Sequence, residues 1–171
     1  VREVTPQADG GALVRGSYQE SFTYRKFIRL RENGSFDPSY SRELFSEPTA
    51  VLTLPDGAVI MSGANSSTPF GPPFGLARFK PDGTVDAAFA PMVRNLGYVH
   101  ALAHASNGAT IVAGTFQTFG VHSTQHLARR NAAGMADPGF ISQSGSILSG
   151  NFDSVVVKAG GEISFFGGFS Q

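Results

Sequence analysis

The chain has 171 residues, with 21 glycines, 10 prolines and neither cysteine nor tryptophan. Its 13 Lys and Arg residues balance 13 Asp and Glu residues, so no cationic surplus favours nucleic acid or an anionic membrane surface. Without cysteine, disulfides, thiolate metal ligands and thiol catalysis are excluded. No apolar run approaches the roughly 20 residues of a membrane-spanning helix. The composition instead favours many short strands joined by tight turns.

Two glycines six residues apart occur four times along the chain. The pairs are Gly10 and Gly16, Gly57 and Gly63, Gly108 and Gly114, and Gly161 and Gly167. The first glycine of each pair follows Asp, Asp, Asn or Gly, which is typical of a two-residue type I′ hairpin turn. Short apolar runs flank these turns and predict strands at 12–14, 51–54, 59–61, 99–103, 110–112, 155–157 and 163–166.

A second pattern follows about twenty residues after each of the first three turns. It contains an Arg, a Gly five residues later, an Asp three residues after the Gly and an aromatic three residues further on. The members are Arg29, Gly34, Asp37 and Tyr40, then Arg78, Gly83, Asp86 and Phe89, then Arg129, Gly134, Asp137 and Phe140. This pattern predicts a third strand, a tight turn and a short fourth strand.

Four-stranded units at intervals of forty to fifty residues are typical of β-propeller blades. The sequence therefore predicts an all-β protein, a β-propeller fragment of about 3.5 four-stranded antiparallel blades. We expect one partial propeller over 1–171. Its units are about 1–47, 48–96, 97–150 and an incomplete 151–171, and they are called units 1 to 4 below.

The two patterns in this order resemble the delta-60 repeat family of bacterial β-propellers. The third unit carries the resemblance best, through Asn107-Gly108, Gly114-Thr115-Phe116, Ala128-Arg129, Gly134, Asp137 and Phe140. The second unit departs from the pattern at Asn65, where the other units have an aromatic residue. The resemblance implies an exported bacterial protein, with an extracellular or cell-surface location. It implies no active site.

The charged residues that recur in register are interpreted as structural. We expect Arg29, Arg78 and Arg129 each to bond a carbonyl or carboxylate in its own or the next blade, with the aspartate of a neighbouring turn as one candidate partner. The repeated aspartates stand alone rather than in acidic clusters. We therefore expect them to fix turns through backbone N–H groups rather than to bind calcium.

The four histidines of the chain all lie in unit 3. His100 and His104 share one predicted strand, where residues four apart lie about 13 Å from each other, too far for one metal ion. His122 and His126 lie in a predicted loop in which they could meet. We expect ordinary surface or edge histidines, and predict neither a metal site nor a cofactor.

The segments between the second and third predicted strands differ most between units. They are Gln19–Arg25, Asn65–Gly75 and Gln117–Gln125. Loops on a rigid scaffold often carry recognition. Five aromatic residues there are candidate contacts for a ligand or partner: Phe22, Tyr24, Phe70, Phe74 and Phe119. The alternative is that these rings pack over blade edges.

The sequence contains no nucleophile elbow, phosphate loop or dinucleotide fingerprint. We expect a non-enzymatic binding or structural propeller module that acts in protein–protein or surface recognition. An enzyme with a site in a channel completed by missing blades is one alternative, and a self-assembling scaffold subunit is another. Open sheet faces favour a segment of a longer protein over copies that assemble into a ring.

Overall fold

The computed structural model describes residues 1–20, 23–40, 47–62, 76–89, 98–116, 118–119, 122–124, 126–132, 134–140 and 149–170. Over these residues the protein is all-β, with several small antiparallel sheets and little helix. This confirms the all-β part of the predicted fold class. A short 3-10 helix, η1 (Pro38–Tyr40), follows the second turn of unit 1.

Each of the first three units forms a three-stranded sheet in which the second strand is central. The strands are β1 (Glu3–Pro6), β2 (Ala12–Glu20) and β3 (Thr23–Leu30), then β4 (Ala50–Thr53), β5 (Val59–Ser62) and β6 (Leu76–Phe79), then β7 (Val99–His104), β8 (Thr110–Gly114) and β11 (Leu127–Arg130). Unit 4 contributes the pair β12 (Ser149–Val157) and β13 (Ile163–Ser170), and unit 3 adds a small hairpin of β9 (Thr118–Phe119) and β10 (His122–Ser123).

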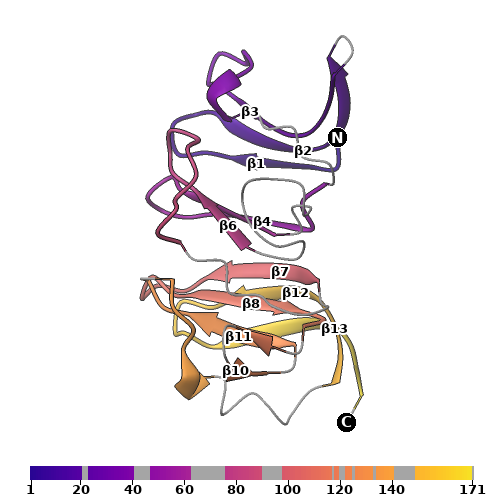
Figure 1. Ribbon diagram of the computed structural model, residues 1–171, viewed down its shortest axis with the longest axis vertical. Helices are drawn as coiled ribbons and strands as arrows, with labels where there is room; N and C mark the ends of the chain where they lie inside the picture. Colours follow the sequence, from indigo (N-terminus) through magenta and orange to yellow (C-terminus); the bar gives the residue numbers. More distant parts are fainter. Residues whose placement is uncertain are drawn as a thin grey trace.

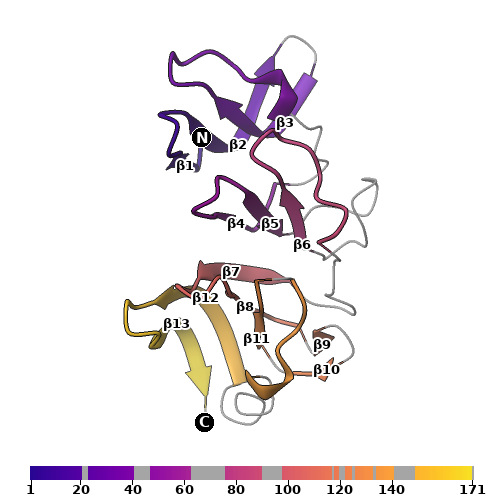
Figure 2. The ribbon, with the colours of Figure 1, turned by 90° about the vertical axis from the view of Figure 1, so that its left-hand side faces the viewer.

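The sheets of units 1, 2 and 3 follow one another along the long axis of the molecule (Figure 1), and β12 and β13 of unit 4 lie beside the sheet of unit 3 at the same end (Figure 2). The view at 90° shows that β1 and β4 lie along one side of the stack and β3 and β6 along the other (Figure 2). First strands of successive units therefore lie near one another, as they do around the axis of a propeller.

The first turn of each unit lies where the sequence predicts, but its type differs. Gly10, Gly57, Gly108 and Gly161 have φ between 79° and 82°, whereas the residues before them do not have positive φ. A type I′ turn needs positive φ at both central residues, so the predicted type is wrong. Gly10 N–H instead donates to Gln7 O, and Gln7 N–H donates to Gly11 O, as in a type I turn closed by a glycine bulge.

The predicted fourth strand is much shorter than expected. Within the described residues it is a single bridge in each unit: Leu30 with Phe36, Phe79 with Val85, and Arg130 with Ala136. The residue after each bridge is the turn aspartate, whose side chain forms local hydrogen bonds. In unit 1, for example, the Asp37 carboxylate accepts the Ser39 N–H at 3.1 Å and draws the chain into η1. Local hydrogen bonding thus competes with strand pairing at this point.

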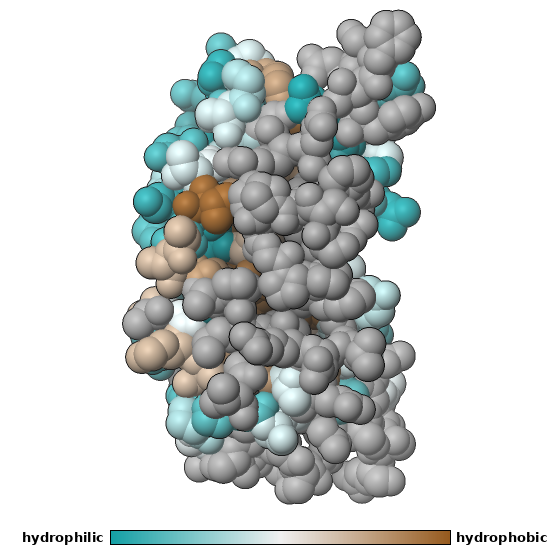
Figure 3. Space-filling model, viewed as in Figure 1, coloured by the Kyte–Doolittle hydropathy of each residue, from teal (hydrophilic) through white to brown (hydrophobic). Residues whose placement is uncertain are grey.

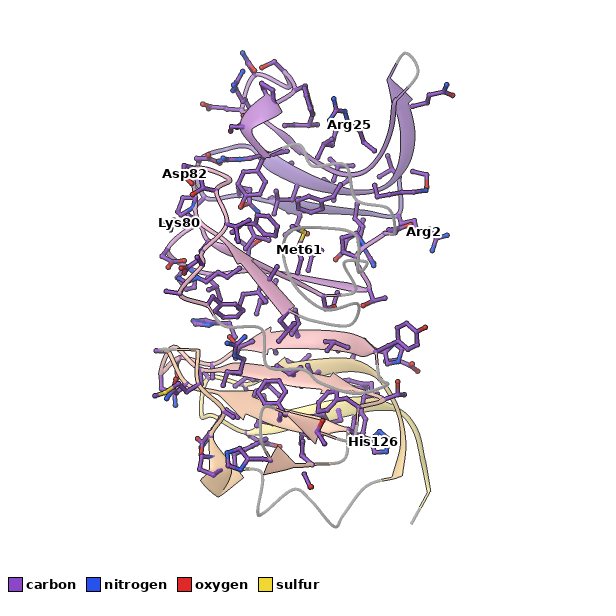
Figure 4. All side chains as sticks on the ribbon, in the orientation of Figure 1. Arg2, Arg25, Met61, Lys80, Asp82 and His126 are labelled. Atoms are coloured by element: carbon purple, nitrogen blue, oxygen red, sulfur yellow. The ribbon has the colours of Figure 1, made fainter. Side chains whose placement is uncertain are left out.

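The core lies between the stacked sheets. All four residues of β5 are buried, because this strand is covered on both faces. Val59 and Met61 pack toward unit 1, with Leu13 and Phe27, while Ile60 packs toward unit 3, with Val112. Figure 4 shows the Met61 side chain between the first and second sheets. A third cluster joins unit 3 to unit 4.

An aromatic residue of one unit inserts against the third strand of the next. The Tyr40 ring centroid lies 6.3 Å from that of Phe79, and the Arg130 guanidinium carbon lies 3.6 Å from the centroid of the Phe89 ring. The aromatic that ends the second sequence pattern therefore links neighbouring units.

Candidate functional site

The repeated arginines form ion pairs with aspartates of their own units. Arg29 pairs with Asp9 of the first turn and lies 3.6 Å from Asp37 of the second. Arg78 repeats this arrangement, 2.6 Å from Asp56 and 3.6 Å from Asp86. Each guanidinium therefore bridges the two turns of its unit, which confirms the prediction of a turn aspartate as partner.

Unit 3 varies this arrangement because Asn107 replaces the first-turn aspartate. Arg129 binds Asp137 instead, with Nε 2.8 Å and Nη2 2.7 Å from Oδ2. This hydrogen bond lowers the pKa of the Asp137 carboxyl, assisted by the Phe140 N–H. Two nitrogens on one oxygen compensate for the missing second carboxylate.

The turn aspartates act as structural residues. The Ser39 hydroxyl is the main cause that lowers the pKa of Asp37, and burial opposes it. The Thr84 hydroxyl is likewise the main cause that lowers the pKa of Asp82. Asp82 and Lys80 lie on the same side of the molecule (Figure 4). Hydrophilic residues gather along this edge beside unit 1 (Figure 3). These carboxylates are occupied in holding turns together.

The histidines of unit 3 lie in separate environments. His126 Nδ1 is 3.0 Å from Gly114 O, and its ring centroid is 6.0 Å from that of Phe152. His100 Nε2 is 3.4 Å from Thr115 Oγ1. Across the part of the chain that the structure describes, no group of three or more His, Asp or Glu side chains could hold a metal ion.

The aromatic residues expected in loops have different positions. Phe22, Phe70 and Phe74 lie outside the described residues, and the Tyr24 backbone lies in β3, paired with Gln19. Phe119 is fully buried in β9, with its ring centroid 6.0 Å from that of Phe116. At Phe119 the structure agrees with the alternative of a packed ring, because the ring lies in the cluster with Phe116 and Val99 and is not available as a contact.

A groove of about 240 Å³ crosses the first strands of all four units. Most of its polar side chains come from different units: Glu3 and Arg15 from unit 1, Thr49 from unit 2, His100 from unit 3, and Asp153 from unit 4. Their chemistry does not repeat, although Thr49, His100 and Asp153 each lie eight residues before a first-turn glycine. Sequence reasoning missed this groove because it searched for residues that recur.

Some side chains of this first-strand groove are held by hydrogen bonds and ion pairs, and others are not. Arg15 Nε lies 2.8 Å from Glu3 Oε2, and its Nη1 donates to Pro48 O at 2.8 Å. Thr49 Oγ1 donates to Val99 O and so joins units 2 and 3. Asp153 is exposed and has no ion pair within the described ranges. The groove therefore presents a free carboxylate and an imidazole beside a braced arginine.

Comparison with known families supports the propeller interpretation. A family model described as "Domain of unknown function (DUF5122) beta-propeller" matches residues 71–89, which include β6 and the second turn of unit 2. No curated protein matches the chain. The match and the small antiparallel sheets together indicate a β-propeller repeat module. In the described ranges, no helix has the length and apolar character needed to cross a membrane.

Proposed function

We propose that the chain is a non-enzymatic β-propeller module of an exported bacterial protein, and that it recognises a protein partner or a surface. The observation that carries this proposal is the first-strand groove, where four units converge with side chains that the repeat does not require. The repeated arginines and aspartates, by contrast, already form ion pairs with one another within each unit. Side chains that differ between the units of a regular scaffold are available to bind a partner.

The chemistry of the groove favours a cationic or hydroxyl-bearing group on the partner. Asp153 supplies a carboxylate with no ion pair among the described residues, and His100 and Glu3 supply further polar atoms along the same groove. An extended peptide segment with a Lys or Arg side chain fits a groove that runs across neighbouring strands. We therefore propose that the partner is a protein.

The test is selection of peptides from a phage-displayed random library on the immobilised chain. We expect enriched peptides that are rich in Lys or Arg and that lose about tenfold in affinity on Asp153→Asn, because a charged contact across an interface is removed. Glu162→Gln is the matched control, since this exposed carboxylate pairs with Lys158 and does not line the groove. Equal affinity for Asp153→Asn and the unaltered chain would contradict the proposal, as would failure to enrich any peptide.

The open face of unit 4 favours a second candidate function, self-assembly through a second copy of the chain. Val156 and Phe166 lie five residues before and five after Gly161, and they are 47% and 57% exposed. Their equivalents around Gly108, Ala103 and Ala113, are buried against unit 4. Val4 of unit 1 is also exposed, whereas its equivalent Val51 packs in the cluster between units 1 and 2. One copy's unit 1 thus presents the residues that would cover another's unit 4.

A further inference from the structure

The sheet of unit 4 has an open edge along β13. In units 1 to 3 the second strand lies between a first and a third strand, whereas within the described ranges β13 pairs with β12 alone. Every residue of β5 and β8 is buried, but none of the residues 163–166 of β13 is. β13 lies at the margin of the molecule, next to the C-terminus (Figure 2). The side of β13 that a third strand covers in the other units is therefore accessible to another polypeptide.

Backbone groups of two residues point to this open edge. Glu162 O accepts the Lys158 N–H at 2.8 Å, so the Glu162 backbone faces the first strand of the unit. Backbone groups of successive residues point to opposite sides of a strand. The N–H and C=O groups of Ile163, and those of Phe165 two residues further on, therefore point away from β12. Such a row of backbone groups at a sheet edge is a template for pairing with another strand.

The pairing of β6 with β5 shows how a strand occupies the equivalent edge in unit 2. Phe79 of β6 lies opposite Val59, which stands two residues after its turn glycine, as Ile163 does. Arg78 O accepts the Asp86 N–H at 2.9 Å, so the Arg78 backbone faces away from β5 and the Phe79 backbone faces toward it. A strand in the same register would place its backbone groups opposite those of Ile163.

The aromatic residue at the end of unit 3 is also less covered than its equivalents. Tyr40 and Phe89 are 2% and 9% exposed. Each contacts the third strand of the following unit, Tyr40 through Phe79 and Phe89 through Arg130. Phe140 packs at the edge of the cluster between units 3 and 4 and is only half-buried. A strand at the edge of β13 would continue this interface and place a side chain against the Phe140 ring.

We propose that the open edge of β13 binds an extended segment of a partner polypeptide by strand addition. The segment runs antiparallel to β13 and carries the Leu-Ala-Arg pattern shared by β6 and β11, followed by an aromatic residue as in β6. The aromatic residue lies opposite Ile163 and contacts Phe140. Hydrogen bonds to the backbone of Ile163 and Phe165 supply affinity, and the side chains of the segment supply specificity.

This site is separate from the first-strand groove. The groove uses residues of β12, which lies on the other side of β13 from the open edge. Binding at the open edge therefore does not depend on the partner proposed for the groove, and Asp153→Asn should leave it unchanged.

The probe is a synthetic peptide with the sequence of residues 76–89, labelled with fluorescein and titrated with the chain by fluorescence anisotropy. We expect saturable binding. Hydrogen exchange followed by NMR locates the bound peptide, and the amides of Ile163 and Phe165 should exchange about tenfold more slowly or less in its presence.

Two N-methylated peptides test the backbone pairing without altering the chain. Methylation at the nitrogen of the Phe79 position removes the N–H that would donate to Ile163 O. Affinity should fall about tenfold, since a hydrogen bond is lost and its acceptor is left unpaired. Methylation at the Arg78 position is the matched control, because that amide points away from β13. It should change the affinity by less than about threefold.

Ile163→Pro tests the same pairing from the side of the chain, because it removes an outward N–H and leaves the pairing with β12 in place. It should lower the affinity about tenfold, whereas Ile163→Ala keeps the N–H and should lower it by about threefold at most. The two N-methylated peptides remain decisive if Ile163→Pro fails to fold. Absence of saturable binding, equal affinity of the two methylated peptides, or protection confined to residues outside β13 would overturn the proposal.

Discussion

At the scale of single residues, the Arg–Asp bonds show how a repeat tolerates substitution. Arg29 and Arg78 each have two carboxylates to bridge. Among the described residues Arg129 pairs with Asp137 alone, at 2.7 Å, which is closer than the 3.6 Å between Arg29 or Arg78 and the second-turn aspartate. A position occupied by Asp in two units and Asn in the third therefore remains compatible with the fold, because the arginine redistributes its hydrogen bonds. The same flexibility makes Asp137 the more critical carboxylate of unit 3.

Asp137→Asn should lower the free energy of unfolding by about 1–2 kcal/mol at pH 7, since hydrogen bonds to charged groups contribute in that range and partial exposure weakens this one. The folded pKa of Asp137 is lowered below the ordinary 3.8. Its contribution is therefore present above the unfolded pKa and disappears as the pH falls through the folded pKa. Urea unfolding at pH 7 and pH 2 measures the effect. The deficit of the variant should be smaller at pH 2 than at pH 7.

Asp153→Asn is the matched control for this experiment, because Asp153 has no ion pair among the described residues. It should change the unfolding free energy by less than about 0.5 kcal/mol at pH 7, as exposed substitutions generally do. A deficit for Asp137→Asn that is equal at both pH values would contradict a role for its charge.

At the scale of elements, the second turn of each unit also forms part of the contact between units. Gly34 and Gly83 both have positive φ, at 77° and 82°. A Cβ on Gly34 would meet no atom within 4 Å, whereas one on Gly83 would lie 2.7 Å from Ser39 O and 2.8 Å from the Tyr40 ring. Gly34 is therefore required only for its positive φ, whereas Gly83 is required both for its positive φ and for close packing against unit 1.

Gly83→Ala should therefore destabilise the chain more than Gly34→Ala. Both carry the penalty of roughly 1–2 kcal/mol for an L-residue at positive φ. Only Gly83→Ala adds the displacement of unit 1, which overpacking data put at about 1–3 kcal/mol. Thermal or urea unfolding of the two variants in parallel measures the difference. Equal destabilisation would show that Gly83 does not hold unit 1 and unit 2 in close contact.

The elements also show what the sequence could predict. Turn positions and the first three strands of units 1 to 3 follow from the glycine and Arg-to-aromatic spacings, because only a few residues tolerate such backbone geometry. The predicted turn type was wrong, since Asp9, Asp56 and Asn107 do not have positive φ, and the side chain of each instead accepts the backbone N–H two residues further on. Phe119 was misplaced because two-residue strands such as β9 leave no periodic signal.

The first-strand groove was not predicted for a different reason. Thr49, His100 and Asp153 occupy the same position in their units but are different residue types. A search for residues that recur between units therefore does not find them. Comparing the units finds the residues that the scaffold requires, and the first-strand groove arises where the units depart from the repeat.

At the scale of the whole molecule, stability accumulates between neighbouring units. Three hydrophobic clusters join units 1 and 2, units 2 and 3, and units 3 and 4. In such a stack each unit buries its faces only against its neighbours. Val156 and Phe166 of the last sheet are exposed, whereas their neighbours Val155 and Phe165 pack in the cluster with unit 3. Exposed apolar residues of this kind favour association.

Light scattering of this 18.0 kDa chain should therefore show a concentration-dependent increase in mass through the proposed contact between unit 4 of one copy and unit 1 of another. Phe166→Asp combined with Val156→Asp should return the chain to a monomer, because a buried unpaired carboxylate is strongly unfavourable at an apolar interface. Met135→Asp is the matched control, since Met135 is also exposed, at 59%, but lies in the second turn of unit 3. It should leave the mass unchanged. A stable monomer of the unaltered chain at about 100 μM, well above the micromolar constants of moderate interfaces, would exclude self-assembly by this face.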